Sequence, residues 1–330
     1  MKTTLLLLAL AATHSFAADA GFTVDPTPAG GLIIKHNGQI FAEYVVDQAN
    51  KPYLAPVFGP TGKQMTRNYP MKKVDGEKQD HPHHRGINFG HEDVSGFDSW
   101  AEKATFEEMN AKKPGSGDAR LAKLGSTKHR EYREMKGGAD SAVVVDVIDW
   151  LDVSGKKLLE EERRMVFSAG EGTRIIDFDQ DLIASAGDAK FEDKKDAGLS
   201  IRVPTSMSVD TQPTGGHIIT SEGKTDKDAW ATHAKWCDYY GPVEGETQGV
   251  AMLNHPSSFR YPTGWHVRTY GLFTANPFAS KQFDKSAPDA AFELKSGERL
   301  KLRHRFVFHS GDEKQGKIEE AWQAYSKESK

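Results

Sequence analysis

The densest chemistry in the chain lies in one stretch, where four histidines fall between positions 81 and 91. They are His81, His83, His84 and His91, and Arg85 follows directly after His84. Imidazole titrates near neutrality and is also the commonest metal ligand in proteins. Three kinds of site suit this stretch: acid/base or hydrogen-bonding contacts to a polar ligand, metal coordination, or a hydrogen-bonded structural loop.

Local sequence favours a loop or a sheet edge for these histidines. Pro82 cannot donate to a strand ladder, and Gly86 lets the backbone turn or approach a ligand closely. We predict that His83 and His84 are catalytic, as a general acid or base, and that Arg85 binds hydroxyls or a carboxylate of the substrate. This interpretation requires no cofactor.

A metal site is the alternative for the same stretch. His81, His83 and either His91 or His255 would supply imidazole ligands to a divalent zinc, copper or iron ion. The protein would then be a metal-dependent oxidoreductase or hydrolase.

A second stretch of aromatic and acidic residues, WCDYYG, begins at Trp236. Alternation along a strand puts Trp236, Asp238 and Tyr240 on one face. An indole beside a carboxylate and a phenol is a common way to hold a sugar. We predict that Trp236 and Tyr240 bind substrate and that the Asp238 carboxylate takes a proton; the alternative is a half-buried strand end.

A third stretch reads NHPSSFRYPTGWHVRTYGLF. Alternation places His266, Arg268 and Tyr270 on one face, and because arginine is rarely buried unpaired we expect this face to line a polar concave surface. We predict that His266 is catalytic, and that four residues bind substrate: Arg268, Tyr270, His255 and Arg260. The chain is expected to fold so that the histidine stretch meets these later stretches.

Composition limits the elements that could position these residues. The 330-residue chain has a formal net charge of −4 and one cysteine, Cys237, so no intrachain disulfide is possible. The charge balance gives no reason to expect a nucleic-acid partner. The 31 glycines and 15 prolines indicate many turns and short strands rather than long helices.

The N-terminus has the pattern of a secretory signal peptide. Lys2 precedes the apolar run from Leu5 to Ala12, and Ser15-Phe16-Ala17 is a small-x-small cleavage site. We predict a signal peptide over residues 1–17, with an exported mature protein in a bacterial periplasm or outside the cell. No later stretch approaches the roughly 20 apolar residues of a transmembrane helix.

Alternating apolar and polar residues predict antiparallel strands in the rest of the chain. The Asn37-Gly38 pair predicts a hairpin within residues 32–46. The clearest strand is RLKLRHRFVFH at 299–309, and further strands are expected at 142–151, 158–168, 174–184, 198–209, 249–254 and 264–273. Residues 101–140 form a polar region in which we predict only an exposed turn at 114–117.

The predicted fold class is mostly β: a large antiparallel β-sandwich with a C-terminal helix, in a single domain over residues 18–330. In the helix, Ile318, Trp322 and Tyr325 form a narrow apolar stripe. This stripe should cap a sheet edge or pack across one end of the sandwich.

Three motifs carry a resemblance to a known family: HPHHRGINFGHEDVSGFDSW, AWATHAKWCDYYG and NHPSSFRYPTGWHVRTYGLFTANPF. Together they resemble the PmoA-like family of exported bacterial proteins, over roughly Tyr53 to Phe278. That family carries the label methane oxygenase. A true methane oxygenase subunit would need several spanning helices, which this chain lacks.

A looser resemblance is to aldose 1-epimerases and other galactose-mutarotase-like supersandwiches. Their His-rich and Gly-rich segment followed by Trp is similar to His83, His84, Gly86 and Trp100, although this chain has Arg85 where that pattern has a glycine. For the late catalytic Glu of that family, Glu244 and Glu246 are candidates by position only. The resemblance implies a sugar-binding concave sheet.

The sequence therefore favours an exported carbohydrate-active protein that performs acid/base chemistry on a sugar or glycoside, as an epimerase, a lyase or a hydrolase. Its partner would be a small-molecule or oligosaccharide ligand. Two alternatives stay open: the metal-dependent enzyme described above, and a glycan-binding protein without catalytic activity.

Overall fold

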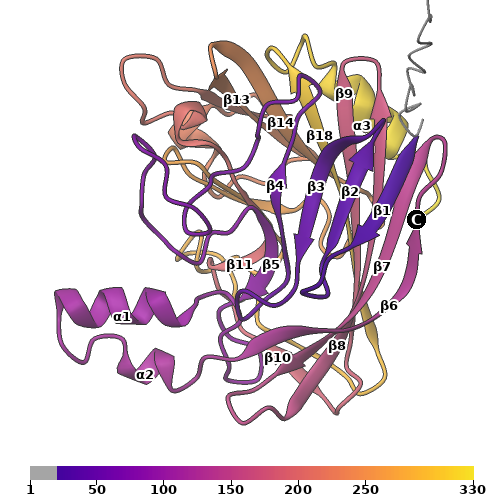
Figure 1. Cartoon of the computed structure of the whole chain (residues 1–330). Helices are drawn as coiled ribbons and strands as arrows, with labels where there is room; N and C mark the ends of the chain where they lie inside the picture. The colour runs from indigo at the N-terminus through magenta and orange to yellow at the C-terminus, as the bar shows by residue number, and fades with distance from the viewer. Residues whose placement is uncertain (1–20) are drawn as a thin grey trace, which may run out of the picture.

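Two eight-stranded antiparallel sheets pack face to face in the computed structural model, which describes residues 21–330 (Figure 1). The predicted signal peptide at 1–17 lies outside the described residues. The first sheet has, in spatial order, β1 (Phe22–Pro26), β2 (Leu32–His36), β3 (Gln39–Val45), β4 (Tyr53–Val57), β5 (Ile87–His91), β11 (Ala197–Arg202), β16 (Leu272–Asn276) and β15 (Gly264–Val267). The second has β12 (His217–Thr220), β13 (Trp236–Val243), β14 (Glu246–Asn254), β18 (Arg299–Ser310), β9 (Thr173–Ile183), β8 (Lys157–Gly170), β7 (Ser141–Leu151) and β6 (Ser126–Lys136). A small third sheet pairs β10 (Ala189–Phe191) with β17 (Phe292–Leu294).

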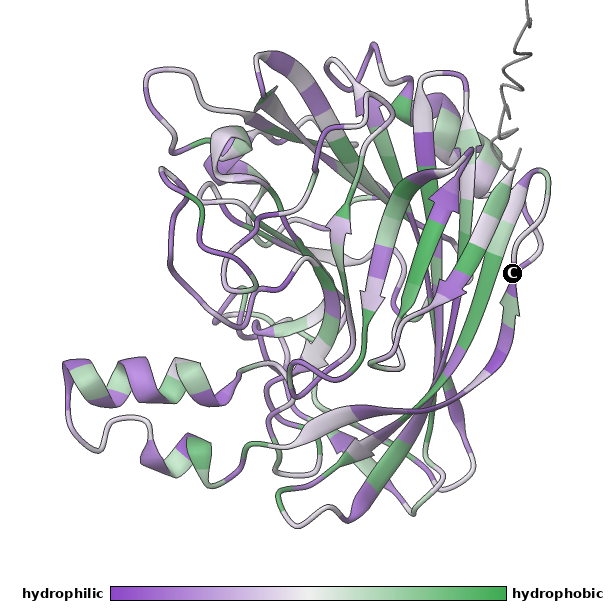
Figure 2. Cartoon of the chain, viewed as in Figure 1, coloured by the Kyte–Doolittle hydropathy of each residue, from purple (hydrophilic) through white to green (hydrophobic). Residues whose placement is uncertain are grey.

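The core lies between the two large sheets and explains the alternation in the sequence. Hydrophobic and hydrophilic residues alternate along the strands of both sheets (Figure 2). The rings of Phe41 and Phe167, from opposite sheets, meet edge to face at 5.6 Å, and those of Phe89 and Trp150 do so at 5.7 Å. One cluster of buried side chains takes members from both sheets. The predicted antiparallel β-sandwich is confirmed.

The predicted C-terminal helix is also confirmed, as α3 (Ile318–Tyr325), but its position differs from the prediction. Instead of capping an edge, α3 covers the outer face of the second sheet, where Ile318 and Tyr325 are fully buried with Leu253 and Val307. The outer face carries an apolar patch there, made by Trp236, Ala251, Leu253 and Val307, so it needs a cover.

Residues 101–140 hold more structure than predicted. Helices α1 (Lys103–Lys112) and α2 (Asp118–Leu121) form an arm that projects from the side of the sandwich (Figure 1), and β6 follows as an edge strand. Only Phe106 of α1 is buried, so its sequence has no apolar stripe to reveal a helix. The prediction of one strand over 264–273 is wrong: a turn ending at Gly271 divides it into β15 and β16.

Within residues 21–330, no helix is long and apolar enough to cross a membrane. A short 3-10 turn at Thr205–Met207 lies between β11 of the first sheet and β12 of the second, and another at Asp226–Ala229 connects β12 with β13.

Candidate functional site

Strand register builds a polar row across the outer face of the first sheet. Asn88 of β5 pairs with Ser200 of β11, Ser200 with Thr274 of β16, and Thr274 with His266 of β15. The residues on either side of each, such as Trp265 and those flanking Thr274, point into the core, so the row faces away from it. All four polar side chains are nevertheless buried, which means that another part of the chain covers them.

The cover is the segment that leads from β5 into the arm. A Cβ on Gly90 would lie 2.7 Å from the Ser99 carbonyl oxygen and 3.0 Å from Trp100 Cα, so only glycine lets this segment cross so close to β5. The crossing places Trp100 over the outer face of the sheet.

A cavity of about 280 Å³ opens beside Trp100. This volume is close to the lower limit for small-molecule sites, about 300 Å³. The lining joins the histidine stretch, the base of the arm, the residues before β11 and the β15–β16 turn: His81, His83, His84, Trp100, Ala101, Thr105, Arg120, Lys195, Asp196, His266, Arg268 and Tyr270. The expected meeting of the first and third stretches therefore occurs, and His266, Arg268 and Tyr270 do share one polar concavity.

Two buried arginines fix the start of the histidine stretch. Arg67 and Arg202 both donate to Asp80 Oδ1, at 2.5 and 2.8 Å, and Arg67 also donates to the His81 carbonyl. Burial would raise the pKa of Asp80, but hydrogen bonding with His81 and the two guanidinium groups outweigh it and lower that pKa. The loop is thus held rigidly although it contains no regular structure.

His266 has a defined tautomer. Its Nδ1 lies 2.5 Å from the Lys195 carbonyl oxygen, which can only accept, so Nδ1 carries the hydrogen and Nε2 has a free lone pair. Nε2 makes no hydrogen bond within residues 21–330 and is not sealed from solvent. Burial lowers the pKa of His266 to about 4, so the ring is neutral at pH 7.

His84 is in the opposite tautomer, with its hydrogen on Nε2. Arg202 Nη1 approaches His84 Nδ1 at 3.4 Å, and because a guanidinium only donates, Nδ1 is the acceptor and Nε2 carries the hydrogen. Burial, reinforced by the neighbouring His83 and Arg202, lowers the pKa of His84 well below its usual value. His83 is held by Thr105 of α1, whose Oγ1 lies 2.8 Å from His83 Nδ1.

Aromatic rings form much of the remaining wall. His81 lies between His84 and Tyr270, stacked on each with ring centroids 4.9 and 5.1 Å apart. Trp100 meets His84 edge to face at 5.9 Å. Arg268 lies over the ring of Trp230, with Cζ 4.6 Å from its centroid.

Arg85 does not line the cavity. Its guanidinium binds the Glu102 carboxylate through Nε and Nη2 at 2.8 to 3.0 Å, and Lys51 Nζ lies 3.6 Å from the same carboxylate. Glu102 is the N-cap of α1 and forms a capping box with Thr105. The structure therefore places Arg85 as an anchor of the arm, where we predicted a substrate contact.

The second stretch lies in the other sheet and does not reach the cavity. Trp236 is covered by α3, and its Nε1 donates to Glu319 at 2.7 Å. Asp238 is fully buried with Oδ1 3.1 Å from His309 Nε2; although burial opposes the charge, Asp238 raises the pKa of His309. Tyr240, half-buried, packs beside His217 of β12.

The other predicted site residues also lie outside the cavity lining. His91 is buried against Phe278, and burial lowers its pKa to about 3. His255 Nε2 lies 3.1 Å from the Glu328 carbonyl oxygen, and Arg260 donates to the Pro277 and Ala290 carbonyls.

The positions of these histidines test the alternative of a metal site formed by His81, His83 and either His91 or His255. His91 and His255 do not join His83 at the cavity. Within residues 21–330 no group of three or more His, Cys, Asp or Glu side chains is arranged to hold a metal ion.

Six lining residues were absent from the predicted site: Trp100, Ala101, Thr105, Arg120, Lys195 and Asp196. Trp100 ended the histidine stretch and could have been included on that ground. The arm residues gave no signal, because the polar sequence around them did not predict a helix. Lys195 and Asp196 lie in an ordinary charged run, DKKD, and only the pairing of β11 with β5 brings them to the site.

Residues 32–323 match the model of a family described as a family of unknown function, DUF6807. The chain belongs to this family. No curated protein matches the chain in sequence. None of these comparisons supports the PmoA-like resemblance, which stays a prediction from the motifs.

Solved structures similar to this DUF6807 chain include sugar enzymes, at low similarity. The galactosidase domain of AgaSK has 8% identity and a TM-score of 0.44, over 87% of this chain and 42% of that chain. The GH36 alpha-galactosidase AgaB from Geobacillus stearothermophilus has 10% identity and a TM-score of 0.42, over 87% and 41%. A galactose mutarotase related enzyme from Lactobacillus acidophilus has 9% identity and a TM-score of 0.34, over 88% and 97%. Similarity at this level carries no activity over to the DUF6807 chain, which spans about two fifths of the galactosidase chains.

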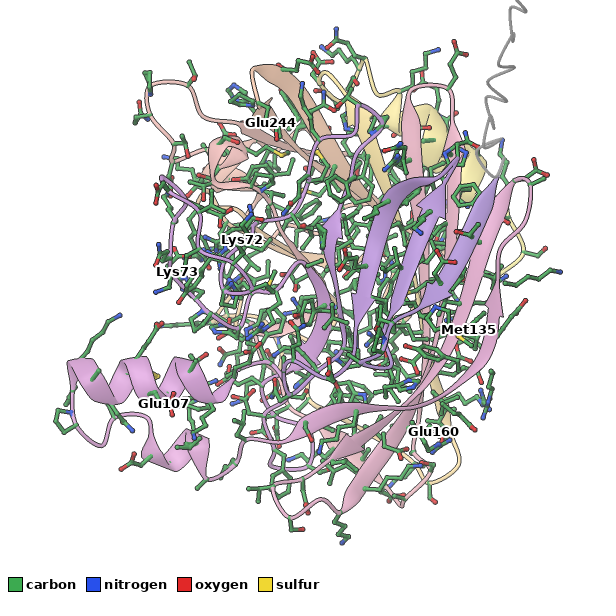
Figure 3. The ribbon with its side chains drawn as sticks, viewed as in Figure 1. Lys72, Lys73, Glu107, Met135, Glu160 and Glu244 are labelled. Atoms are coloured by element: carbon green, nitrogen blue, oxygen red, sulfur yellow. The ribbon has the colours of Figure 1, made fainter. Side chains whose placement is uncertain are left out.

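The two glutamates suggested by the mutarotase resemblance lie elsewhere. Glu244 occupies the turn between β13 and β14, far along the sandwich from the arm that carries Glu107 (Figure 3). Glu246 pairs with Lys63 at 2.5 Å. Neither lines the histidine cavity.

Proposed function

We propose that the chain binds a carbohydrate in the histidine cavity and catalyses acid/base chemistry on it. One observation carries the proposal: two neutral imidazoles of opposite polarity open into one small cavity. His84 offers an Nε2 hydrogen and His266 offers an Nε2 lone pair. A sugar presents both an oxygen to protonate and a hydroxyl to deprotonate.

The roles follow from the two tautomers. His84 donates a hydrogen bond from Nε2 to a ring or glycosidic oxygen and stabilises the negative charge that develops there, because a neutral imidazole does not release its last proton. His266 accepts a proton from a hydroxyl through Nε2 and returns it to the leaving oxygen. Each such transfer contributes about 10²–10⁴-fold in rate. Because Asp238 is buried in the other sheet, His266 takes the base role that the sequence assigned to that carboxylate.

Aromatic walls support a sugar ligand. Trp100 and Tyr270 supply flat apolar surface next to hydrogen-bonding groups, and this combination suits the apolar face and the hydroxyl edge of a pyranose. Transfer of a proton from the anomeric hydroxyl to the ring oxygen opens the ring, so interconversion of anomers, which is epimerisation at C1, is the simplest reaction for this pair. In a hydrolase the same base would activate the water that attacks the glycosidic bond. In a lyase it would remove a proton from carbon while the glycosidic oxygen leaves.

The test is magnetisation-exchange NMR on a panel of reducing sugars with purified protein. We expect the wild type to accelerate anomer exchange of at least one sugar, and His266→Gln and His84→Gln to lower that acceleration about 100-fold or more. His217→Gln is the matched control, since His217 is exposed on β12. Full acceleration in both cavity variants contradicts the acid/base roles, and sugar binding without any turnover indicates a glycan-binding protein.

Metal analysis separates this proposal from the metal-dependent alternative. The protein would be purified without a metal-affinity tag, and bound metal would be measured beside His83→Ala. We expect no stoichiometric metal; about one equivalent that is lost in His83→Ala would overturn the metal-free chemistry.

We also propose that the protein is exported, on the basis of its N-terminal pattern. Mass spectrometry of the mature protein from a bacterial host should give an N-terminus at Ala18. A retained Met1 terminus in the cytoplasmic fraction would contradict export.

A further inference from the structure

The cationic side chains around the histidine cavity differ in whether their charge is already paired. Arg120 donates to Asp98 at 2.8 Å and lies 3.4 Å from Glu92. Lys195 Nζ lies 2.8 Å from Asp196 Oδ2. These cations are therefore neutralised by the protein itself.

Arg268 differs from them. Its side chain makes no hydrogen bond or ion pair within residues 21–330, although it is half-buried in the cavity wall. Its guanidinium contacts are with aromatic rings, 4.6 Å from Trp230 and 5.8 Å from Tyr270. A guanidinium has five N–H donors, and an aromatic ring beneath one face leaves the donors at its edge available.

We infer that the ligand carries a carboxylate that binds Arg268, so that the substrate class is uronic acids or their glycosides. This inference rests on the proposed function and names the ligand of the same cavity. A planar carboxylate matches the guanidinium edge with two parallel hydrogen bonds, a geometry that a neutral hydroxyl cannot provide.

The position of Arg268 next to His266 also favours a carboxylate on the ligand. Trp230 contacts both Arg268 and His266. The ring centroids of Trp230 and His266 are 4.8 Å apart. A carboxylate on Arg268 would thus anchor one end of the ligand next to the base. Arg67 and Arg202 cannot serve in its place, because both are engaged by Asp80.

The experiment compares matched sugar pairs by isothermal titration calorimetry: galacturonate with galactose, and glucuronate with glucose. We expect one uronate to bind the wild type about tenfold or more tightly than its neutral partner, in line with a charge-assisted pair. Arg268→Gln should remove the difference in affinity between the uronate and the neutral sugar, and Arg268→Lys should keep part of this difference. Added salt should make the difference smaller in the wild type.

Arg299→Gln is the control, because Arg299 is a half-exposed arginine on the second sheet. Circular dichroism establishes that each variant is folded. Equal affinity for both members of every pair, or an unchanged preference in Arg268→Gln, overturns the carboxylate inference and leaves the sugar site standing. Absence of binding by all four sugars overturns the inference and the proposed function together.

Discussion

At the scale of single residues, the protonation state of His266 determines what the cavity can do. The ring is buried, donates to a backbone carbonyl through Nδ1 and packs edge to face on Trp230. A base of this kind works only when it is unprotonated.

The pH profile of anomer exchange should therefore show an acid limb. Burial lowers the pKa of His266 to about 4, so the rate should rise as pH increases through about 4 and stay level from about pH 5 to neutrality. Exchange rates measured across this range, with the solvent-catalysed rate subtracted, provide the check. A midpoint near 6.5 would mean that an ordinary exposed histidine is the base.

Thr105 is predicted to be a positioning residue for His83, whose ring packs edge to face against that of His84 at 4.3 Å and so holds His84 in place. Thr105→Val keeps the shape but removes the Oγ1 that lies 2.8 Å from His83 Nδ1. We expect about a tenfold lower rate and a cost near 1 kcal/mol in stability. The ¹⁵N chemical shifts of the His83 ring should move, which a purely structural effect would not require.

The matched control is Thr127→Val. Thr127 is buried more deeply than the half-buried Thr105, and its Oγ1 has no hydrogen-bond partner within residues 21–330. Both the rate and the His83 shifts should stay unchanged in this variant. Equal losses in the two variants would contradict a specific role for Thr105.

At the scale of elements, the α1–α2 arm depends on one buried carboxylate. Glu102 caps α1, binds Arg85 through two nitrogens and lies beside Lys51, whose own pKa is lowered by burial. Lys51 also donates to the Trp100 carbonyl at 2.6 Å, so the same cluster holds the cavity wall.

Glu102→Gln should cost about 3 kcal/mol in the free energy of unfolding, because it leaves the buried Lys51 and the half-buried Arg85 without their carboxylate. Urea denaturation followed by tryptophan fluorescence measures this cost. Glu107→Gln, on the exposed side of the same helix (Figure 3), should stay within about 0.5 kcal/mol of the wild type. Similar costs for the two variants would refute the anchor role.

The elements also show why part of the architecture was visible in the sequence. Residues 142–151 and 299–309 each have one face in the core, so their alternation predicts strands directly. Helix α1 buries a single phenylalanine and β6 lies at an exposed edge, so neither has a strong hydrophobic period. The position of α3 depended on an apolar patch that Trp236, Leu253 and Val307 form together, and only the pairing of β13, β14 and β18 creates this patch.

The site residues also fall into those that the sequence could predict and those that depend on contacts between distant segments. We predicted that His266, Arg268 and Tyr270 belong to the site because three polar side chains on one face of a strand do not suit a hydrophobic core. The sequence could not reveal that Arg85 has a buried partner in Glu102, or that Trp236 and Asp238 belong to the opposite sheet. Unpaired and paired arginines look alike until their partners are known.

At the scale of the whole molecule, several histidines are buried in the neutral state. Burial lowers the pKa of His91 and of His304 to about 3, and that of His266 to about 4. The unfolded chain, with histidine pKa values near 6.5, binds more protons than the folded chain in this range, so stability should fall as pH falls below 6.5.

Each of these histidines should lower the free energy of unfolding by about 1.4 kcal/mol per pH unit once the pH is below the histidine pKa of the unfolded chain. Urea midpoints at pH 6.5 and 5 measure the slope, and His304→Asn should reduce it. His309 has a raised pKa, so its pair with Asp238 is lost only as pH rises above 6.5 and does not affect this limb. A stability that is flat between pH 6.5 and 5 would contradict neutral burial.

Both sheets combine hairpins of consecutive strands with pairings between segments that are far apart along the chain. Strands β6, β7, β8 and β9 are consecutive hairpins, whereas Asn88 and Ser200 of the polar row are 112 residues apart, and His266 is 71 residues from Lys195. Pairings between distant segments form slowly, because the intervening chain must first close into a loop. The consecutive hairpins of both sheets should therefore form before the distant pairings, and the ability to bind ligand should arrive with the pairing of β5, β11 and β16. A refolding chain would acquire most of its strand signal before it acquired its cavity.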